Sequence, residues 1–528
     1  MNKNIFKSIT SFALLAALPF LTYAQDKPNW QNLDLKTDSV FGISTEKAYK
    51  ELLKGKKSTP VLVAVLDGGI DLNHEDLKRV IWINKKEIAG NGLDDDKNGY
   101  IDDINGWSFL GGKNGSIEFE TLELTRLVRR DNARFGNITS TSDMLDKDVA
   151  EYNTFIKNRD ALEQRLATAK SDLQGVSGFK NVLDALVKKI GKPNPSVADF
   201  KSYRALNQQD ERMRVTMLDI LKDMDFQTFY EDQIEAGYKQ SYEMVNYNLN
   251  IDYNPRDIVG DDPNNSKERF YGNNDIKGPD ALHGSHVAGI IGADRTNNLG
   301  IKGVADNVII IGVRNTPNGD ERDKDVANAI RYAADNGAKV LNMSFGKGYS
   351  WDKAIVDEAV KYAVSKDVLL VQAAGNDNAD IDVEANFPSK KYLDGGSASS
   401  WITVGASGPI DGDELKAPFS NYGKTTVDVF APGVKIHSSV PDNKYKDENG
   451  TSMAAPVVTG LAALIRSYYP NLKATQVKEI ILKSVTKVNH NVSNMKGAET
   501  VSIPFTDLCV TGGIVNAYNA LKLAATYK

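Results

Sequence analysis

Intramolecular disulfides are excluded, because the 528 residues include a single cysteine, Cys509. Stability must come from the packed core, with bound metal as a possible further source. The chain also lacks a strong excess of one charge, and its net charge of −6 offers no electrostatic footprint for nucleic acid. With 41% hydrophobic and 25% charged residues, it is neither a disordered chain, a fibrous repeat nor a polytopic membrane protein.

Long apolar runs are also missing, apart from a short one near the N-terminus. Residues 1–24 combine Lys3 and Lys7 with an apolar run over 9–21 and end in small residues. This pattern predicts a secretory signal peptide that is cut before Gln25. A membrane anchor is the alternative, but the run is too short to span a bilayer. We therefore expect an exported bacterial protein without a membrane span, either periplasmic or extracellular.

Continuous β-rich apolar runs alternate with helical patterns on both sides of the middle of the chain. The helical patterns include 325–336 and 351–365. The apolar runs, which are typical of strands buried on both faces, are 61–66, 308–313, 340–344, 368–374 and 401–406. The alternation predicts an α/β fold in which a mainly parallel sheet is covered by helices on both faces.

The middle of the chain has a different residue pattern. Apolar residues recur there at helical spacing with charges between them, and Pro193 and Pro195 interrupt the run. We interpret this stretch as a helical insertion that either aids folding, forms a lid or restricts access to a site elsewhere in the chain, or is a solvated decoration. The predicted organisation is a signal peptide (1–24), two parts of one α/β domain (25–109 and 281–528) and the insertion between them (110–280).

Four polar residues follow predicted strands or begin predicted helices. Asp67 ends an apolar run, Asn376 follows another, and His283 and Ser452 begin helical patterns. Each has an ordinary alternative: a turn residue for Asp67 and Asn376, a helix cap for Ser452, and a metal pair with His286 for His283. Taken together, the order Asp, His, Ser is one of the known chain orders of the serine-hydrolase triad.

The sequences around these residues resemble the subtilisin-like serine peptidases, the subtilases. The resemblance spans about 38–109 and 280–522, and Ser285 and Gly68 depart from the usual family residues without removing a catalytic group. The matching stretches are AVLDGGIDLNHEDL (64–77), HGSHVAGIIGA (283–293), VLNMSFG (340–346), AAGN (373–376), FAPG (430–433) and GTSMAAPVVTGLAALI (450–465). The resemblance implies the three-layer subtilisin-like fold.

The resemblance also implies a secreted, calcium-stabilised serine endopeptidase. Ser452 would be the nucleophile, His283 the general base and acid, and Asp67 the group that orients the imidazole. Asn376 and the backbone N–H of Ser452 would form the oxyanion hole. The residues expected to bind extended polypeptide substrate are Ser344, Phe345, Gly346, Ala374 and Gly375. We expect a monomer; the competing hypothesis is a catalytically silent subtilase scaffold that binds peptides or protein partners.

Two calcium sites are predicted, the first from residue spacing. Asp94, Asp96 and Asn98 stand at alternate positions before a glycine, as in the first half of an EF-hand loop. The twelfth position is Asn105 rather than Glu. Either Asp102 or Asp103 would then have to supply the remaining ligand, and an acidic solvated turn is the alternative.

The second site follows from the resemblance alone. Asp76 and Asn297 match family calcium ligands, and the carbonyl groups of Leu299 and Ile301 would complete the site.

Overall fold

The computed structural model describes residues 29–138, 140–142, 144–497 and 499–527, so the predicted signal peptide lies outside the described residues. The chain divides into two compact units. One, the helical unit, is Leu124–Tyr253. The other, the catalytic unit, includes the described residues of Ala24–Glu123 and Asn254–Lys528. Residues 110–123 and 254–280, which the sequence analysis assigned to the insertion, therefore belong with the catalytic unit.

A nine-stranded sheet is the centre of the catalytic unit, with the order β12-β15-β9-β8-β7-β6-β1-β5-β2. All neighbouring strands are parallel except β12 and β15, which are antiparallel. The α/β fold with a mainly parallel sheet is thus confirmed. The strands are β1 (Val61–Asp67), β2 (Gly106–Ser108), β5 (Val308–Arg314), β6 (Val340–Met343), β7 (Leu369–Ala373), β8 (Trp401–Ser407), β9 (Val429–Pro432), β12 (Thr486–Lys487) and β15 (Gly513–Ile514).

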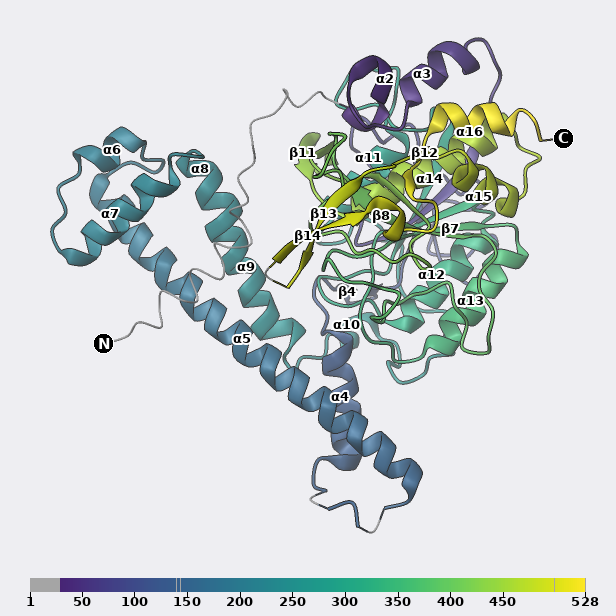
Figure 1. Cartoon of the computed structure of the whole chain (residues 1–528). Coiled ribbons are helices and arrows are strands. Elements are labelled where there is room, and N and C mark those ends of the chain that lie inside the picture. The colour runs from purple at the N-terminus through teal and green to yellow at the C-terminus, as the bar shows by residue number, and fades with distance from the viewer. Residues whose placement is uncertain (1–28, 139, 143, 498, 528) are drawn as a thin grey trace. The chain divides into compact units, whose positions relative to one another are not determined.

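Side chains of β1 enter two hydrophobic clusters, one on each face of the sheet. Val63 and Val65 pack in one cluster, whereas Ala64 and Leu66 pack in the other. This is the alternation expected of a strand buried on both faces. Figure 1 shows helices on both sides of the sheet. The first cluster includes α11 (Leu282–Gly292), α14 (Thr451–Tyr468), α15 (Ala474–Lys483) and α16 (Ala517–Ala524); the second includes α12 (Asp323–Asp335) and α13 (Lys353–Ser365).

Shorter elements complete the catalytic unit. They are the helices α2 (Leu35–Asp38), α3 (Thr45–Ala48) and α10 (Arg256–Val259), and the paired strands β3 (Gly111–Gly112) with β4 (Gly115–Ser116), β10 (Ile436–Val440) with β11 (Lys444–Glu448), and β13 (Asn491–Lys496) with β14 (Glu499–Pro504).

The helical unit is built along one helix of 45 residues, α5 (Asp146–Ile190). Gly191 ends α5 in a left-handed conformation, and the capping box at Ser196 begins α6 (Val197–Ser202) after the two prolines. The unit's own hydrophobic cluster joins α5 to the helices that follow it. Its other α-helices are α7 (Gln208–Ile220), α8 (Phe226–Phe229) and α9 (Ala236–Glu243), and it also contains most of α4 (Glu123–Phe135).

Among the described residues, no helix has the length and apolar character that crossing a bilayer requires.

Candidate active site

Asp67 and His283 meet at the carboxyl end of the sheet. Asp67 is the last residue of β1, and His283 lies in the first turn of α11. The His283 ring nitrogen Nδ1 lies 2.8 and 3.0 Å from the two carboxylate oxygens of Asp67. A carboxylate can only accept here, so Nδ1 carries the proton and Nε2 is free to act as a base.

Electrostatics at this pair favour the imidazolium. Burial lowers the pKa of His283, but the Asp67 carboxylate raises it, and the resulting pKa is above the ordinary value. Asp67 is held in turn, because its carboxylate accepts a hydrogen bond of 2.7 Å from the Gly68 N–H. The pair can therefore accept a proton and stabilise the charge that results.

Ser452 lies in the first turn of α14, where backbone N–H groups have no partner within the helix. Its hydroxyl donates to the backbone carbonyl of Ser344 at 3.1 Å. Among the described residues no hydrogen bond joins Ser452 to His283. A catalytic hydrogen bond is often long in a substrate-free enzyme and tightens when substrate binds.

Asn376 is oriented through its side-chain oxygen. This oxygen accepts hydrogen bonds of 2.9 Å from both the backbone N–H and the hydroxyl of Thr451. Since the oxygen is engaged, the amide nitrogen Nδ2 is the end that remains available to donate. A methyl carbon on Gly450 would lie 3.5 Å from both Asn376 Nδ2 and the backbone nitrogen of Ser452. Two donors therefore flank one point at Gly450, and such a convergence of donors could hold an oxyanion.

The predicted substrate-binding residues lie in two segments that follow neighbouring strands. Ser344, Phe345 and Gly346 follow β6; the Ser344 hydroxyl donates to the carbonyl of Ser452, and the Phe345 side chain is buried in a hydrophobic cluster. Ala374 and Gly375 follow β7.

Asn386 contacts both of these segments. It donates from Nδ2 to the carbonyl of Ala374 at 3.2 Å. A Cβ on Gly346 would lie 3.0 Å from its Oδ1. Asn386 therefore lies between the two segments that are expected to hold substrate.

The first predicted calcium loop assembles only partly as expected. Ligand atoms of Glu87, Asp96 and Asp103 lie within 4.8 Å of one another. The Oε2 atom of Glu87 is buried without a hydrogen-bond partner. Burial raises the pKa of Asp103 to about 6. A buried unpartnered carboxylate oxygen among like charges fits a hard cation such as Ca²⁺.

The other predicted ligands of this loop have different partners. Asp102 accepts hydrogen bonds of 2.8 Å from the N–H groups of Gly90 and Gly92, so it stays outside the group. Asp94 accepts from two backbone N–H groups within the loop, and the Asn98 amide donates to Asp103 at 3.0 Å.

Asp76 and Asn297 lie in contact, with the Asn297 amide donating to the buried Asp76 carboxylate. The Tyr445 hydroxyl and the Ile301 N–H also donate to it, at 3.1 and 3.3 Å. The carboxylate is thus surrounded by hydrogen-bond donors, and the second calcium site stays a prediction.

Sequence reasoning missed Glu87, Thr451 and Asn386. Thr451 has a sequence signal, because it adjoins Ser452 at a helix start. Glu87 has only a weak one: the missing glutamate at the twelfth loop position means that an acid from elsewhere could contribute. Asn386 has none, because only the folded chain brings it beside residues 346 and 374.

Comparisons with known proteins identify relatives. The model of the Subtilase family matches residues 58–498. The chain is 37% identical to a thermophilic serine proteinase of Bacillus sp. (strain AK1), over 45% of this chain and 52% of that protein. It is 37% identical to subtilisin DY of Bacillus licheniformis, over 41% of this chain and 74% of that protein. The match thus spans about half the length of the first relative and three quarters of the second.

A solved structure of proteases from Pseudoalteromonas arctica PAMC 21717 is 27% identical, with a TM-score of 0.39, over 48% of this chain and 78% of that one.

Proposed function

The chain belongs to the subtilase family, and from that premise we propose that it is a serine endopeptidase that hydrolyses polypeptides through an acyl-enzyme on Ser452. The observation that carries the proposal is the contact of Asp67 with His283, together with two donors, Asn376 Nδ2 and Ser452 N, that flank one point at Gly450.

In the first half of the reaction, His283 Nε2 takes the proton from Ser452 Oγ as that oxygen attacks the substrate carbonyl carbon. The carbonyl oxygen becomes an oxyanion and accepts hydrogen bonds from Asn376 Nδ2 and the backbone N–H of Ser452. The imidazolium is stabilised by the Asp67 carboxylate, and it then gives its proton to the leaving amine. The acyl group stays on Ser452 Oγ.

In the second half, a water molecule takes the place of the leaving amine. His283 removes a proton from it as the water oxygen attacks the acyl carbon. The bond between that carbon and Ser452 Oγ then breaks, the proton passes from His283 to Oγ, and the new carboxyl terminus of the product leaves. An extended substrate strand alongside residues 344–346 would hold the scissile bond through backbone contacts, which tolerate many side chains. Unfolded or loop polypeptide is therefore the proposed substrate class.

Calcium is the proposed structural cation. Glu87, Asp96 and Asp103 would hold it, and it would neutralise their mutual repulsion. The signal-like N-terminus supports export, and we propose that the exported protein acts as a monomer.

The test pairs the purified protein with Ser452→Ala. A fluorophosphonate probe should label the wild type and not the variant, and unfolded casein should be cut only by the wild type, with a loss of at least about 10⁴-fold in the variant. Ser467→Ala is a matched control, because Ser467 is a buried serine on the same helix and should leave labelling intact. A folded wild type that neither labels nor cleaves would favour the silent scaffold.

A further inference from the structure

An asparagine from another part of the chain holds the loop that carries Asn376. Asn421 lies between β8 and β9 and is 3% exposed. Its Oδ1 accepts hydrogen bonds from the N–H groups of Asp377 and Ala379, at 2.9 and 2.8 Å. Its Nδ2 donates to the carbonyl of Ala374 at 2.9 Å. One side chain thus binds backbone groups on both sides of Asn376.

The backbone of the same residue adds a further contact, and the loop fits closely around it. The Asn421 N–H donates to the carbonyl of Gly375 at 2.9 Å. Gly375 has a φ of +102°, and a Cβ there would lie 2.4 Å from Asn421 Nδ2. The loop can therefore approach Asn421 this closely only because residue 375 is glycine.

We propose that Asn421 is a positioning residue for the oxyanion hole: it fixes the backbone around Asn376 so that Nδ2 meets the oxyanion. Thr451 sets the orientation of the Asn376 side chain, and Asn421 sets the position of its backbone. This inference rests on the proposed function. Preorganised donors stabilise charge without a cost of reorganisation during the reaction, so a loose loop weakens the transition state more than the ground state.

Only an amide satisfies all three side-chain contacts. It offers an acceptor to two N–H groups and a donor to one carbonyl. Aspartate keeps the acceptor contacts but loses the donor, and it adds a negative charge near the developing oxyanion. Alanine loses all three contacts.

The experiment is a double-mutant cycle with Asn421→Ala and Asn376→Ala. Asn376→Ala should lower kcat about 10²- to 10³-fold, the magnitude known for one oxyanion-hole donor in this family. Asn421→Ala should lower kcat about 10- to 100-fold in the wild type, with KM changed less than about threefold. In the Asn376→Ala background, Asn421→Ala should lower kcat less than about threefold, because the effect of Asn421 passes through Asn376.

Controls separate positioning from folding. Asn328→Ala removes an asparagine that is also 3% exposed and binds Glu268 and Tyr271. It should leave kcat within about twofold at a comparable loss of thermal stability. Amide hydrogen exchange over 374–379 should rise in Asn421→Ala only. Should Asn421→Ala fail to fold, the uncharged Asn421→Ser takes its place in the cycle with the same expectation.

The outcomes are distinguishable. Equal losses from Asn421→Ala in both backgrounds, or a kcat like that of Asn328→Ala, overturn the positioning role while the peptidase stands. A folded wild type that neither labels with fluorophosphonate nor cleaves casein overturns both proposals.

Discussion

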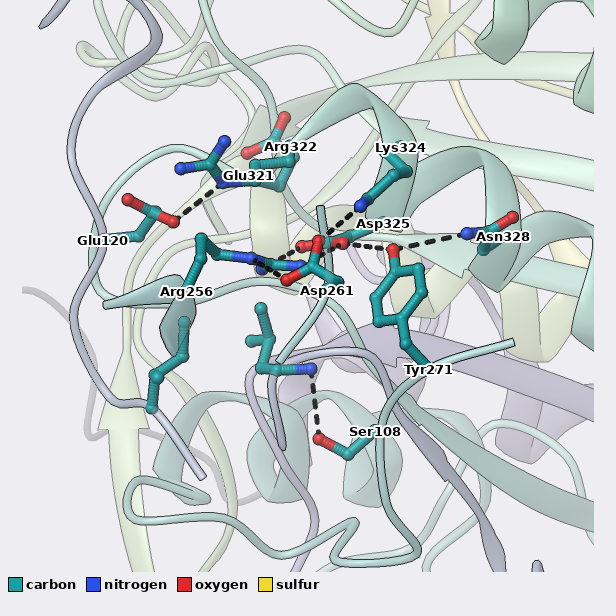
Figure 2. Close-up of polar contacts among 12 residues, drawn as sticks. Ser108, Glu120, Arg256, Asp261, Tyr271, Glu321, Arg322, Lys324, Asp325 and Asn328 are labelled. Carbon is teal, nitrogen blue, oxygen red and sulfur yellow. Dashed lines mark hydrogen bonds and ion pairs between the residues drawn. The ribbon is translucent and has the colours of Figure 1, made fainter. Parts of the chain in front are cut away.

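One network of charged side chains in the catalytic unit is buried and connects segments that are distant in sequence. The Arg256 guanidinium, 1% exposed, pairs with Asp261 at 2.7 Å and with Asp325 at 2.9 Å (Figure 2). The Tyr271 hydroxyl also donates to Asp325, and Lys324 pairs with Asp261. These contacts join the segment after the helical unit to α12, as Figure 2 shows.

Many ion pairs of the helical unit are exposed and local instead. Arg159 pairs with its neighbour Asp160, and Lys222 pairs with Asp219 three residues away. Exposed pairs of this kind contribute little to stability, whereas a buried charge that loses its partner is costly. The comparison teaches that the buried network around Arg256 specifies tertiary contacts, while these exposed pairs of the helical unit mainly support single helices and turns.

The largest expected effect is at Arg256. Arg256→Met should lower the free energy of unfolding of the catalytic unit by about 3–5 kcal/mol, because Asp325 stays buried with only the neutral Tyr271 hydroxyl as a donor and Asp261 keeps only Lys324. Denaturant unfolding followed by tryptophan fluorescence measures it. A loss below about 1 kcal/mol would show that the network is dispensable and would contradict the difference drawn between buried and exposed ion pairs.

Calcium removal should affect the catalytic unit alone. Chelation at pH 7.5 should destabilise it by about 2–3 kcal/mol if calcium is otherwise present at about 100 times its Kd. The effect should shrink at pH 5, because the pKa of Asp103 is raised to about 6 and its protonated form does not bind a cation. Without a cation, this raised pKa also means that stability falls as pH rises through about 6.

Two variants sharpen the calcium test in thermal unfolding with and without chelator. Glu87→Gln should abolish the response to calcium. Asp102→Asn should retain it, because Asp102 lies outside the carboxylate group. A response lost in Asp102→Asn and kept in Glu87→Gln would restore the ligand set that the sequence predicted.

The acid limb of the pH profile compares two histidines whose carboxylate partners differ in burial: Asp67 beside His283 is buried, and Asp411 beside His490 is exposed. Because the pKa of His283 is raised above 6.5, kcat/KM should fall about tenfold per pH unit below a midpoint above 6.5. Asp411→Asn removes the partner of the exposed His490 and should leave this midpoint unchanged. A midpoint at or below pH 6 would contradict the Asp67 contribution.

Excision of the helical unit should have a small effect on the catalytic unit. Its ends lie close together, since Arg129 donates to the carbonyl groups of Ile251 and Tyr253 at 2.6 and 2.7 Å. A short Gly/Ser linker in place of 124–253 should preserve fluorophosphonate labelling and shift Tm by only about 2–4 °C, the size of a change near 1 kcal/mol. Failure to fold would instead identify the unit as a folding aid.

The smallest effect is expected at the exposed pair. Lys222→Ala should change the free energy of unfolding by less than about 0.5 kcal/mol, because solvent already screens the pair. Thermal unfolding of Lys222→Ala and Arg256→Met side by side compares an exposed with a buried ion pair. A loss of stability above about 2 kcal/mol in Lys222→Ala would contradict the difference between the two units.

The strands of the catalytic unit were predictable because their apolar runs are continuous and β-rich, and helical patterns between the runs indicated helices such as α12 and α13. The run at 61–66 became β1, and that at 401–406 became β8. The bounds of the helical unit were harder to predict from the sequence. Residues 254–280 have no periodic pattern, and only contacts such as that of Arg256 with Asp325 join them to the catalytic unit.

By itself, the sequence determined the family, the α/β fold and the residue types expected at the active site, because these depend on local patterns and contiguous motifs. Only the tertiary structure decided that Glu87 joins Asp96 and Asp103 while Asp102 does not, and that Asn421 holds the loop of Asn376. The physical reason is that hydrogen bonds and ligand groups depend on distances of a few ångströms between atoms. For residues far apart in the chain, only folding sets those distances.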